Sequence, residues 1–331
     1  MSGSACAVAA LPARPCGKPV SFKERMTLAD HDSMSQAAPR QTLTYLRNLF
    51  AARGIHPKNK LGQSFLIDLN LLDVLLRAAE LTREDLVLEV GSGTGGLTAR
   101  LADQAGRVLS VEIDGAFVEM ASQAVAGRSN VTLLHADVLK NKNHLSPLVL
   151  ERIEDLQKLG VCQRLKLVAN LPYAVATPVL ANFLLSDYSF ERMVVMVQWE
   201  IAERLLASPG TKDYGALAVL VQSIADVEAV RRRVPPAVFW PRPQVASAII
   251  MIRPNAAKRA HVDDVRRFRN FLRDLYTQRR KTLRSALAGL PSGRRPKAEV
   301  DASLAELGIP GTIRAEDLDV EQHLRLCAAF G

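Results

Sequence analysis

Hydrophobic residues between Thr42 and Pro254 recur at two spacings, one typical of strands and one typical of helices. Short, continuous apolar runs predict buried strands at residues 86–91, 107–113, 130–137, 165–170, 193–199 and 245–252. Apolar residues three or four positions apart predict amphipathic helices at residues 42–54, 69–80, 95–105, 115–126, 147–159, 176–186, 200–207 and 215–224. Because strands and helices alternate, we expect an α/β fold with a doubly wound, mostly parallel sheet.

The two ends of the chain depart from this alternation. After Pro254 only helical periodicity remains, which predicts helices within residues 262–289, 298–308 and 320–330. The N-terminal residues are rich in Ala, Ser, Pro and Gly and show no sustained period, as in disordered segments. We therefore expect three parts: a disordered extension at 1–41, the α/β domain at 42–256, and a small C-terminal helical domain at 257–331.

Composition limits the class of protein. Hydrophobic residues make up 48% of the 331 residues, which is enough for a sizeable core. No apolar run approaches the roughly 18 residues of a membrane span, so we expect a soluble, cytoplasmic protein. The sequence has no obvious dimerising stripe, and we expect a monomer. We expect neither a metal site nor a disulfide framework, because the chain has no CxxC pair and no histidine spacing typical of metal ligands. The four cysteines are far apart, at Cys6, Cys16, Cys162 and Cys327.

The net charge of +9 is concentrated in one segment. Between Lys258 and Lys297, thirteen Lys or Arg residues stand against three acids. Such a patch favours binding to nucleic-acid phosphates, because released counterions drive the association. A solvated basic helix face is the alternative. The candidate RNA-binding residues in this segment are Arg279, Arg280, Lys281 and Arg284.

A glycine-rich loop follows the first predicted strand. Gly91 and Gly93 begin a G-x-G-x-x-G spacing, which permits a tight turn and lets a ligand approach the backbone at the start of a helix. The spacing fits a dinucleotide, S-adenosylmethionine, or a tight turn without ligand. Glu112 closes the second strand, where an acid accepts hydrogen bonds from ribose hydroxyls. Asp137 ends the third strand and suits either a contact with the cofactor's adenine or an Asx turn.

The fourth strand ends in the tetrapeptide Asn170-Leu-Pro-Tyr173, which presents an amide, a backbone carbonyl and an aromatic ring together. These groups suit a flat base that carries an exocyclic amine, such as adenine. The N6 nitrogen of adenine is a poor nucleophile, because its lone pair is delocalised into the ring. The Asn170 side chain and the Leu171 carbonyl would accept hydrogen bonds from both amino hydrogens, and Tyr173 would stack on the base. Positioning for attack on a methyl sulfonium then requires no His or Cys nucleophile. The alternative is an ordinary turn.

Five motifs in this order resemble those of the small-subunit ribosomal RNA adenine N6-dimethyltransferases of the KsgA/RsmA type, and more distantly the ribosome-methylating macrolide-resistance enzymes. The motifs are LGQSFLID (61–68), LEVGSGTGGLT (88–98), NLPY (170–173), FWPRPQVASAII (239–250) and QRRKTLRSAL (278–287). Four features depart from the family pattern: Ser64 replaces an Asn, Ala174 follows NLPY in place of an Asn, residues 140–163 are long, and so is the N-terminal tail.

The resemblance implies a Rossmann-like, S-adenosylmethionine-dependent enzyme. Its activity would be the dimethylation of N6 of two adjacent adenosines near the 3′ end of 16S rRNA in the small ribosomal subunit, with a role in subunit biogenesis. Phe239 would lie on the face of the target base opposite Tyr173. The cofactor-binding residues would be Ser64, Leu66, Gly91, Gly93, Glu112, Asp137 and Asn170.

Three rival hypotheses remain. A nicotinamide-dependent oxidoreductase would use the glycine loop but neither NLPY nor the basic helices. A DNA adenine methyltransferase would use the same base chemistry on another polymer, although the motifs at 239–250 and 278–287 favour rRNA. A non-catalytic RNA-binding or ribosome-assembly factor would keep the fold without needing Asn170 and Tyr173.

Overall fold

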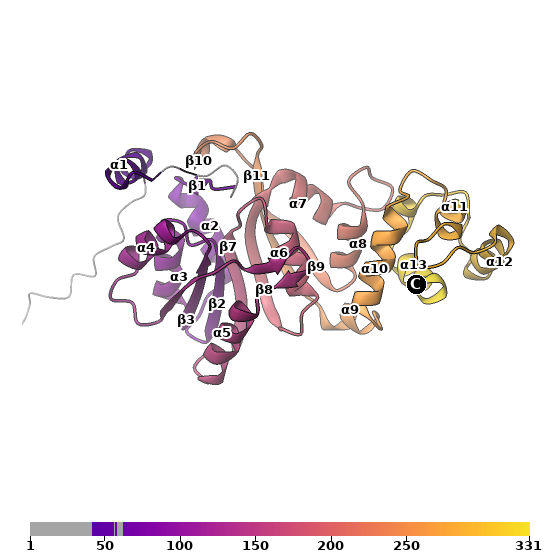
Figure 1. The fold of residues 1–331 in the computed structure, drawn as a ribbon, viewed down its shortest axis with the longest axis horizontal. Helices are drawn as coiled ribbons and strands as arrows, with labels where there is room; N and C mark the ends of the chain where they lie inside the picture. Colours follow the sequence, from indigo (N-terminus) through magenta and orange to yellow (C-terminus); the bar gives the residue numbers. More distant parts are fainter. Residues whose placement is uncertain (1–41, 56, 58–61) are drawn as a thin grey trace, which may run out of the picture. The chain divides into compact units, whose positions relative to one another are not determined.

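This computed structural model describes residues 42–55, 57 and 62–331 (Figure 1). The extension expected at 1–41 lies outside these residues. The described residues form one compact unit. No helix in the described part of the chain is long and apolar enough to cross a membrane.

A seven-stranded sheet has the strand order β4-β3-β2-β7-β8-β11-β9. The first five strands in this order are parallel, and β11 and β9 are antiparallel to their neighbours, which confirms the prediction of a mostly parallel sheet. The strands are β2 (Asp85–Val90), β3 (Arg107–Glu112), β4 (Val131–His135), β7 (Arg164–Asn170), β8 (Phe190–Gln198), β9 (Ala225–Val234) and β11 (Ser247–Pro254).

Helices cover both faces of the sheet because successive strand residues point to opposite sides. In β2, Val87 packs with α2 and α3, whereas Leu86 and Leu88 pack with the apolar faces of α5, α6 and α7. The helices of the α/β part are α1 (Leu43–Arg53), α2 (Leu69–Ala79), α3 (Gly96–Gln104), α4 (Gly115–Ala124), α5 (Pro147–Lys158), α6 (Ala176–Leu184), α7 (Trp199–Leu206) and α8 (Ala216–Gln222).

Five strands, each short or polar, were not predicted from the sequence. The strand β9 is one of them, because it lies at the sheet edge and most of its side chains are not buried. The other four form two-stranded sheets, in which two or three residues are too few for a recognisable period. These pairs are β1 (Phe65–Leu66) with β10 (Phe239–Trp240), and β5 (Leu139–Asn141) with β6 (His144–Leu145).

The C-terminal helices enclose a second hydrophobic core. The helix expected at 262–289 is two helices, separated by a turn at residues 277–282. α8 also contributes to this second core, and Leu184 packs against both cores. The helices after the sheet are α9 (Ala256–Ala260), α10 (Val265–Tyr276), α11 (Leu283–Ala288), α12 (Lys297–Leu307) and α13 (Val320–Phe330), with 3₁₀ turns at η2 (Pro236–Val238) and η3 (Ala315–Asp317).

Candidate cofactor and target-base site

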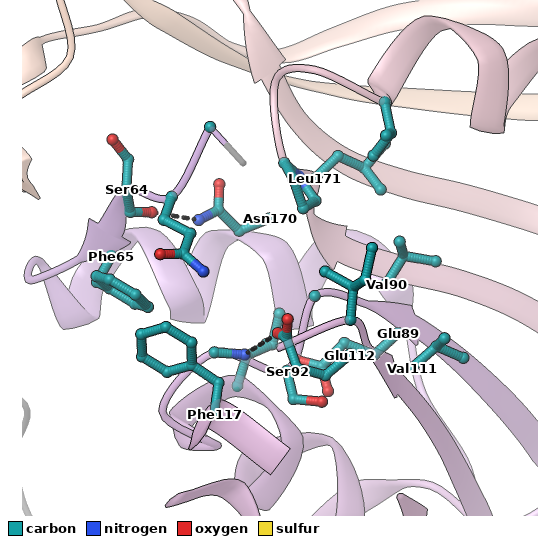
Figure 2. Close-up of a pocket in the computed structure, with 18 of the residues that line it drawn as sticks. Ser64, Phe65, Glu89, Val90, Ser92, Val111, Glu112, Phe117, Asn170 and Leu171 are labelled. Atoms are coloured by element: carbon teal, nitrogen blue, oxygen red, sulfur yellow. Dashed lines mark hydrogen bonds between the residues drawn. The ribbon is translucent and has the colours of Figure 1, made fainter. Parts of the chain in front are cut away.

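A cavity of about 290 Å³ opens at the carboxyl edge of the parallel strands, where doubly wound sheets bind ligands (Figure 2). Five segments that the sequence singled out meet there, although they are far apart along the chain. They are the LGQSFLID motif, the glycine loop, the end of β3, the residues just after β4, and NLPY. Of the candidate site residues, those that line the cavity are Ser64, Leu66, Gly91, Gly93, Glu112, Asp137, Asn170, Leu171 and Tyr173.

The glycine loop fits closely between NLPY and α4. Gly91 has a φ of +88°, and a Cβ there would lie 3.1 Å from Cγ of Pro172. Gly95 has a φ of +80°, and a Cβ there would lie 2.8 Å from Cα of Ala121 in α4. Both positions therefore require glycine for the backbone conformation and for the close packing. This packing places the loop beside the candidate base-binding motif.

Glu112 is held at the end of β3 by backbone donors. Gly93 N–H donates to Oε2 at 3.0 Å and Asp114 N–H donates to Oε1 at 3.0 Å. Burial raises the pKa of the carboxyl group. Each carboxylate oxygen accepts more than one hydrogen bond, so Glu112 can also accept from a ligand hydroxyl in the cavity.

Glu89 lines the same cavity and was missed at the sequence level. It is fully buried in β2, and Oε2 accepts hydrogen bonds from the hydroxyls of Thr98 and Ser110, each at 2.6 Å. Burial raises its pKa to about 8, and Oε1 has no partner among the described residues. A neutral carboxyl group can donate as well as accept a hydrogen bond. The available signal was a single acid inside the otherwise apolar run LVLEV.

Asn170 has one satisfied end and one unsatisfied end. Its Nδ2 donates to the backbone carbonyl of Ser64 at 3.1 Å, and Oδ1 is buried without a partner in the described part of the chain (Figure 2). The hydroxyl of Ser64 in turn donates to the carbonyl of Pro241 at 3.1 Å. A buried, unpaired acceptor costs about 1–3 kcal/mol, so this amide is well suited to a donor that a ligand supplies.

Tyr173 lines the cavity and is anchored through its hydroxyl. The Tyr173 and Ser247 hydroxyls form a hydrogen bond of 2.8 Å, and burial raises the pKa of the phenol. The Asx turn considered for Asp137 is present, because its Oδ1 accepts from Leu139 N–H at 2.8 Å. Asp137 still lines the cavity. Its contact with a cofactor stays a prediction.

Phe239 does not line the cavity, contrary to its expected place beside the target base. Its side chain is 2% exposed and belongs to the core cluster that also contains Leu66 and Met196. The β1–β10 pairing places Phe239 opposite Leu66. Phe239 is therefore a core aromatic beside a Pro-rich turn.

Two aromatic residues that the sequence did not single out form one wall of the cavity. Phe65 and Phe117 line it, with ring centroids 5.0 Å apart (Figure 2). Phe50 of α1 packs behind them, at 5.2 Å from Phe65 and 5.6 Å from Phe117. The first described helix thus supports this wall.

The candidate RNA-binding residues lie outside the cavity, in and after the turn between α10 and α11. Arg279 Nε donates to Glu316 at 2.6 Å and also bonds to the Lys212 carbonyl. Arg284 Nε donates to Asp301 at 2.6 Å. By contrast, the other two residues are exposed and form no ion pair with a described residue: Arg280 and Lys281.

Comparison with known proteins agrees with this arrangement. A family model described as "Ribosomal RNA adenine dimethylase" matches residues 55–330. The ribosomal RNA small subunit methyltransferase A of Pelotomaculum thermopropionicum is 41% identical over 289 residues, covering 86% of this chain and 95% of the relative. The protein of the same name from Ligilactobacillus salivarius is 39% identical, covering 87% and 94%.

Two solved structures also match most of this chain. A dimethyladenosine transferase from Plasmodium falciparum matches with a TM-score of 0.65 and 25% identity, over 80% of this chain and 97% of that one. The 23S rRNA methyltransferase ErmE matches with a TM-score of 0.56 and 25% identity, over 80% and 99%.

Proposed function

This chain belongs to the ribosomal RNA adenine dimethylase family, and on that premise we propose which groups perform its reaction and on which RNA. It is an S-adenosylmethionine-dependent rRNA adenine dimethyltransferase of the small-subunit type. The proposed reaction places two methyl groups on N6 of each of two adjacent adenosines near the 3′ end of small-subunit rRNA.

The observation that carries the proposal is the unpaired Oδ1 of Asn170. The amide cannot rotate to satisfy this oxygen without breaking the bond from Nδ2 to Ser64. An adenine whose N6 amino group reaches the cavity would supply the missing donor. The carbonyl of Leu171 would accept the second amino hydrogen. Two acceptors on one amino group favour a pyramidal nitrogen with a more available lone pair.

The residues around the cavity suit S-adenosylmethionine. When bound, this cofactor supplies an electrophilic methyl group on a sulfonium ion. The glycine loop would let the backbone approach the cofactor, Glu112 would accept hydrogen bonds from its ribose hydroxyls, and the Phe65–Phe117 wall would offer it an apolar surface. We assign its binding to Ser64, Leu66, Gly91, Gly93, Glu112, Asp137 and Asn170.

Tyr173 would hold the target base. An adenosine in folded RNA must leave its stack before it can enter a cavity of this kind. Stacking on an aromatic ring returns about 1–3 kcal/mol per base. The hydrogen bond between the phenol and the Ser247 hydroxyl restricts the ring to one orientation, so less conformational freedom is lost when the base arrives.

RNA affinity would come from the helical part of the chain. We propose residues 42–256 as the methyltransferase domain and residues 257–331 as the RNA-binding domain, with α8 bridging their cores. Arg280 and Lys281 carry the exposed, unpaired charge, and we assign the main phosphate contacts to them. Arg279 and Arg284 share the surface but are already committed to ion pairs.

We further propose that the protein acts as a monomer on the small subunit, and therefore where that subunit is assembled, in the cytoplasm. One molecule contains the whole cavity and the basic turn. The sequence has no obvious dimerising stripe, which favours a single copy.

The experiment is methyl transfer from labelled S-adenosylmethionine to small subunits isolated from a strain that lacks this enzyme. Digestion of the rRNA and mass spectrometry of the nucleosides should show N6,N6-dimethyladenosine. Large subunits and duplex DNA serve as parallel substrates and should remain unlabelled. Binding to small subunits without any methyl transfer would overturn the proposal in favour of an assembly factor, and labelling of DNA would overturn the substrate.

A further inference from the structure

Four arginines outside the cavity occur together without an acid among them. Residues 229–247 contain these four and neither Asp nor Glu. All four are exposed, and none forms an ion pair within residues 42–55, 57 and 62–331. We call this set the arginine edge: Arg231, Arg232 and Arg233 of β9, and Arg242 of the turn between β10 and β11.

The sheet topology puts the arginine edge on the same side of the molecule as the cavity. β9 is antiparallel to β11, and β11 is antiparallel to β8, so β9 runs in the same direction as β7 and β8. Arg231, Arg232 and Arg233 lie at the carboxyl end of β9. Asn170 lies at the carboxyl end of β7, and both ends therefore reach the same edge of the sheet.

Short contacts connect the arginine edge to the candidate base-binding residues. Ser247 lies opposite Val234 of β9, next to Arg233, and its hydroxyl bonds to that of Tyr173 at 2.8 Å. Pro241, next to Arg242, accepts the hydrogen bond from Ser64 at 3.1 Å. Residues next to the arginine edge are thus hydrogen-bonded to two residues that line the cavity, Ser64 and Tyr173.

Charge is separated along β9. The acids near its start are neutralised, because Asp226 pairs with Lys258 at 2.7 Å and Glu228 pairs with Arg253 at 3.4 Å. At the other end the guanidinium of Arg233 lies over the Trp199 ring, 5.0 Å from its centroid. Stacking fixes the plane of a guanidinium and leaves N–H donors at its rim for an anion.

We propose that the arginine edge binds phosphates of the rRNA strand that flanks the target adenosine. This inference rests on the proposed function, because the flanking strand must lie at the cavity from which the base enters. Phosphate contacts position a nucleic acid without reading its sequence. Contacts beside the cavity hold the strand after the adenosine has left its stack, whereas the basic turn between α10 and α11 contributes affinity from the helical part.

A different explanation of the same residues is protection of the sheet. β9 is an edge strand, and charged side chains on edge strands prevent pairing with another chain. Both explanations require exposed charge, but only RNA binding requires the charge to change the salt dependence of subunit binding. The test therefore measures that dependence.

The test is the double substitution Arg231→Gln and Arg232→Gln in the full chain. Binding of undermethylated small subunits is measured over a series of salt concentrations. Each lost phosphate contact reduces the slope of log K against log salt by about 0.7–0.9, so two contacts predict a slope shallower by about 1.4–1.8. Affinity at low salt should fall roughly tenfold or more. Calorimetry with S-adenosylmethionine shows whether the variant is folded.

The control is Arg152→Gln with Lys158→Gln on α5, which removes the same net charge from two exposed side chains that each pair with an acid of their own helix. α5 leads to the amino end of β7, at the opposite edge of the sheet. The salt dependence of subunit binding by this control should therefore have the wild-type slope. Arg231→Lys with Arg232→Lys keeps the charge and should restore the slope. An equal change in the control would overturn the proposal, because net charge alone would then explain the effect.

Failure of the arginine edge and failure of the proposed function would give different results. An unchanged slope in the glutamine variant overturns the arginine edge as an RNA contact, and self-association of that variant in sedimentation would assign the arginines to edge protection. Absence of methyl transfer by the wild type to small subunits would instead overturn the proposed function itself. The wild type is measured in the same series, so the two failures are distinguishable.

Discussion

The cavity at the sheet edge and the basic turn between α10 and α11 leave opposite kinds of polar group unsatisfied. In the cavity the unsatisfied group is a buried acceptor, Oδ1 of Asn170, on an amide that Ser64 holds in place. In the turn the unsatisfied groups are the exposed cations of Arg280 and Lys281, while Arg279 is held by Glu316. One region has a fixed geometry, and the other has solvated charge.

This difference has a physical consequence. Burying an acceptor without a partner costs about 1–3 kcal/mol, and such an atom is positioned before the ligand arrives. An exposed cation costs little in the free protein, and its attraction to phosphates weakens as salt is added. Substitutions in the cavity should therefore change the rate of methyl transfer, and substitutions in the turn should change binding of the subunit.

The largest expected effect is that of Asn170→Ala. Loss of one positioned hydrogen-bonding group at a reacting centre typically lowers kcat by about 10²–10³-fold. We expect a loss of this size in methyl transfer to small subunits, with subunit affinity close to that of the wild type. Single-turnover transfer and filter binding measure the two quantities separately.

A matched control for this prediction is Ser64→Ala. The carbonyl that holds Asn170 is a backbone group, so the substitution leaves the bond to Asn170 in place and removes the hydroxyl bond to Pro241. Because Ser64 is also assigned to cofactor binding, transfer by both variants is measured at saturating S-adenosylmethionine. Its effect on turnover should be much smaller than that of Asn170→Ala. Comparable losses in both variants would mean that the amide acts through local structure and does not contact the base.

The second effect, on binding, is that of Arg280→Gln with Lys281→Gln. Removal of two unpaired cations should make the salt dependence of subunit binding shallower by about 1.4–1.8 in slope, with an affinity loss of roughly tenfold at low salt. Arg284→Gln is the comparison, because Arg284 is already paired with Asp301. If Arg284→Gln changed the slope more than the double variant, the distinction between paired and unpaired cations would be wrong.

Strand ends explain how much of the cavity the sequence predicted. Gly91, Glu112 and Asn170 each follow an apolar run, and parallel strands bring their carboxyl ends to one edge. Their convergence in one cavity therefore follows from the order of strands and helices along the chain. The raised pKa of Glu89 does not follow from this order, because it depends on complete burial by helices and strands that are distant in sequence.

The errors come from contacts between distant segments. Phe239 lies in the core because the two-residue strand β10 pairs with β1, which places Phe239 opposite Leu66. Strands this short have no recognisable period in the sequence. The strand β9 was missed because an edge strand need not be apolar. The acid that neutralises Arg279 is 37 residues away and the one that neutralises Arg284 is 17 residues away, so local charge counting overstated the free charge of the turn.

The cavity and the helical core each contain a buried titratable group, Glu89 and His323, that should make stability depend on pH. Burial raises the pKa of Glu89 to about 8, above its ordinary value of 4.5. The folded state therefore binds more protons than the unfolded state between these values. Stability should fall as pH rises through this window, by up to about 1.4 kcal/mol per pH unit. Urea titrations from pH 5 to 8.5 should show this slope, and Glu89→Gln should reduce it.

The helical core should respond to pH in the opposite direction. His323 is fully buried, its ring stacks on that of Tyr276 at 5.8 Å, and burial lowers its pKa to about 4 from 6.5. Between these values the unfolded chain holds a proton that the folded chain does not. Stability should therefore fall as pH drops from 6.5 to 4, again by up to about 1.4 kcal/mol per pH unit.

The substitution His323→Gln isolates this effect, since it removes the buried imidazole from the helical core. Urea titrations between pH 4 and 7 should show a smaller acid loss of stability in this variant than in the wild type, even if its stability at pH 7 is lower. His261→Gln is the control, because His261 is exposed and should leave the acid loss as it is. Equal acid sensitivity in all three proteins would mean that groups outside the helical core govern it.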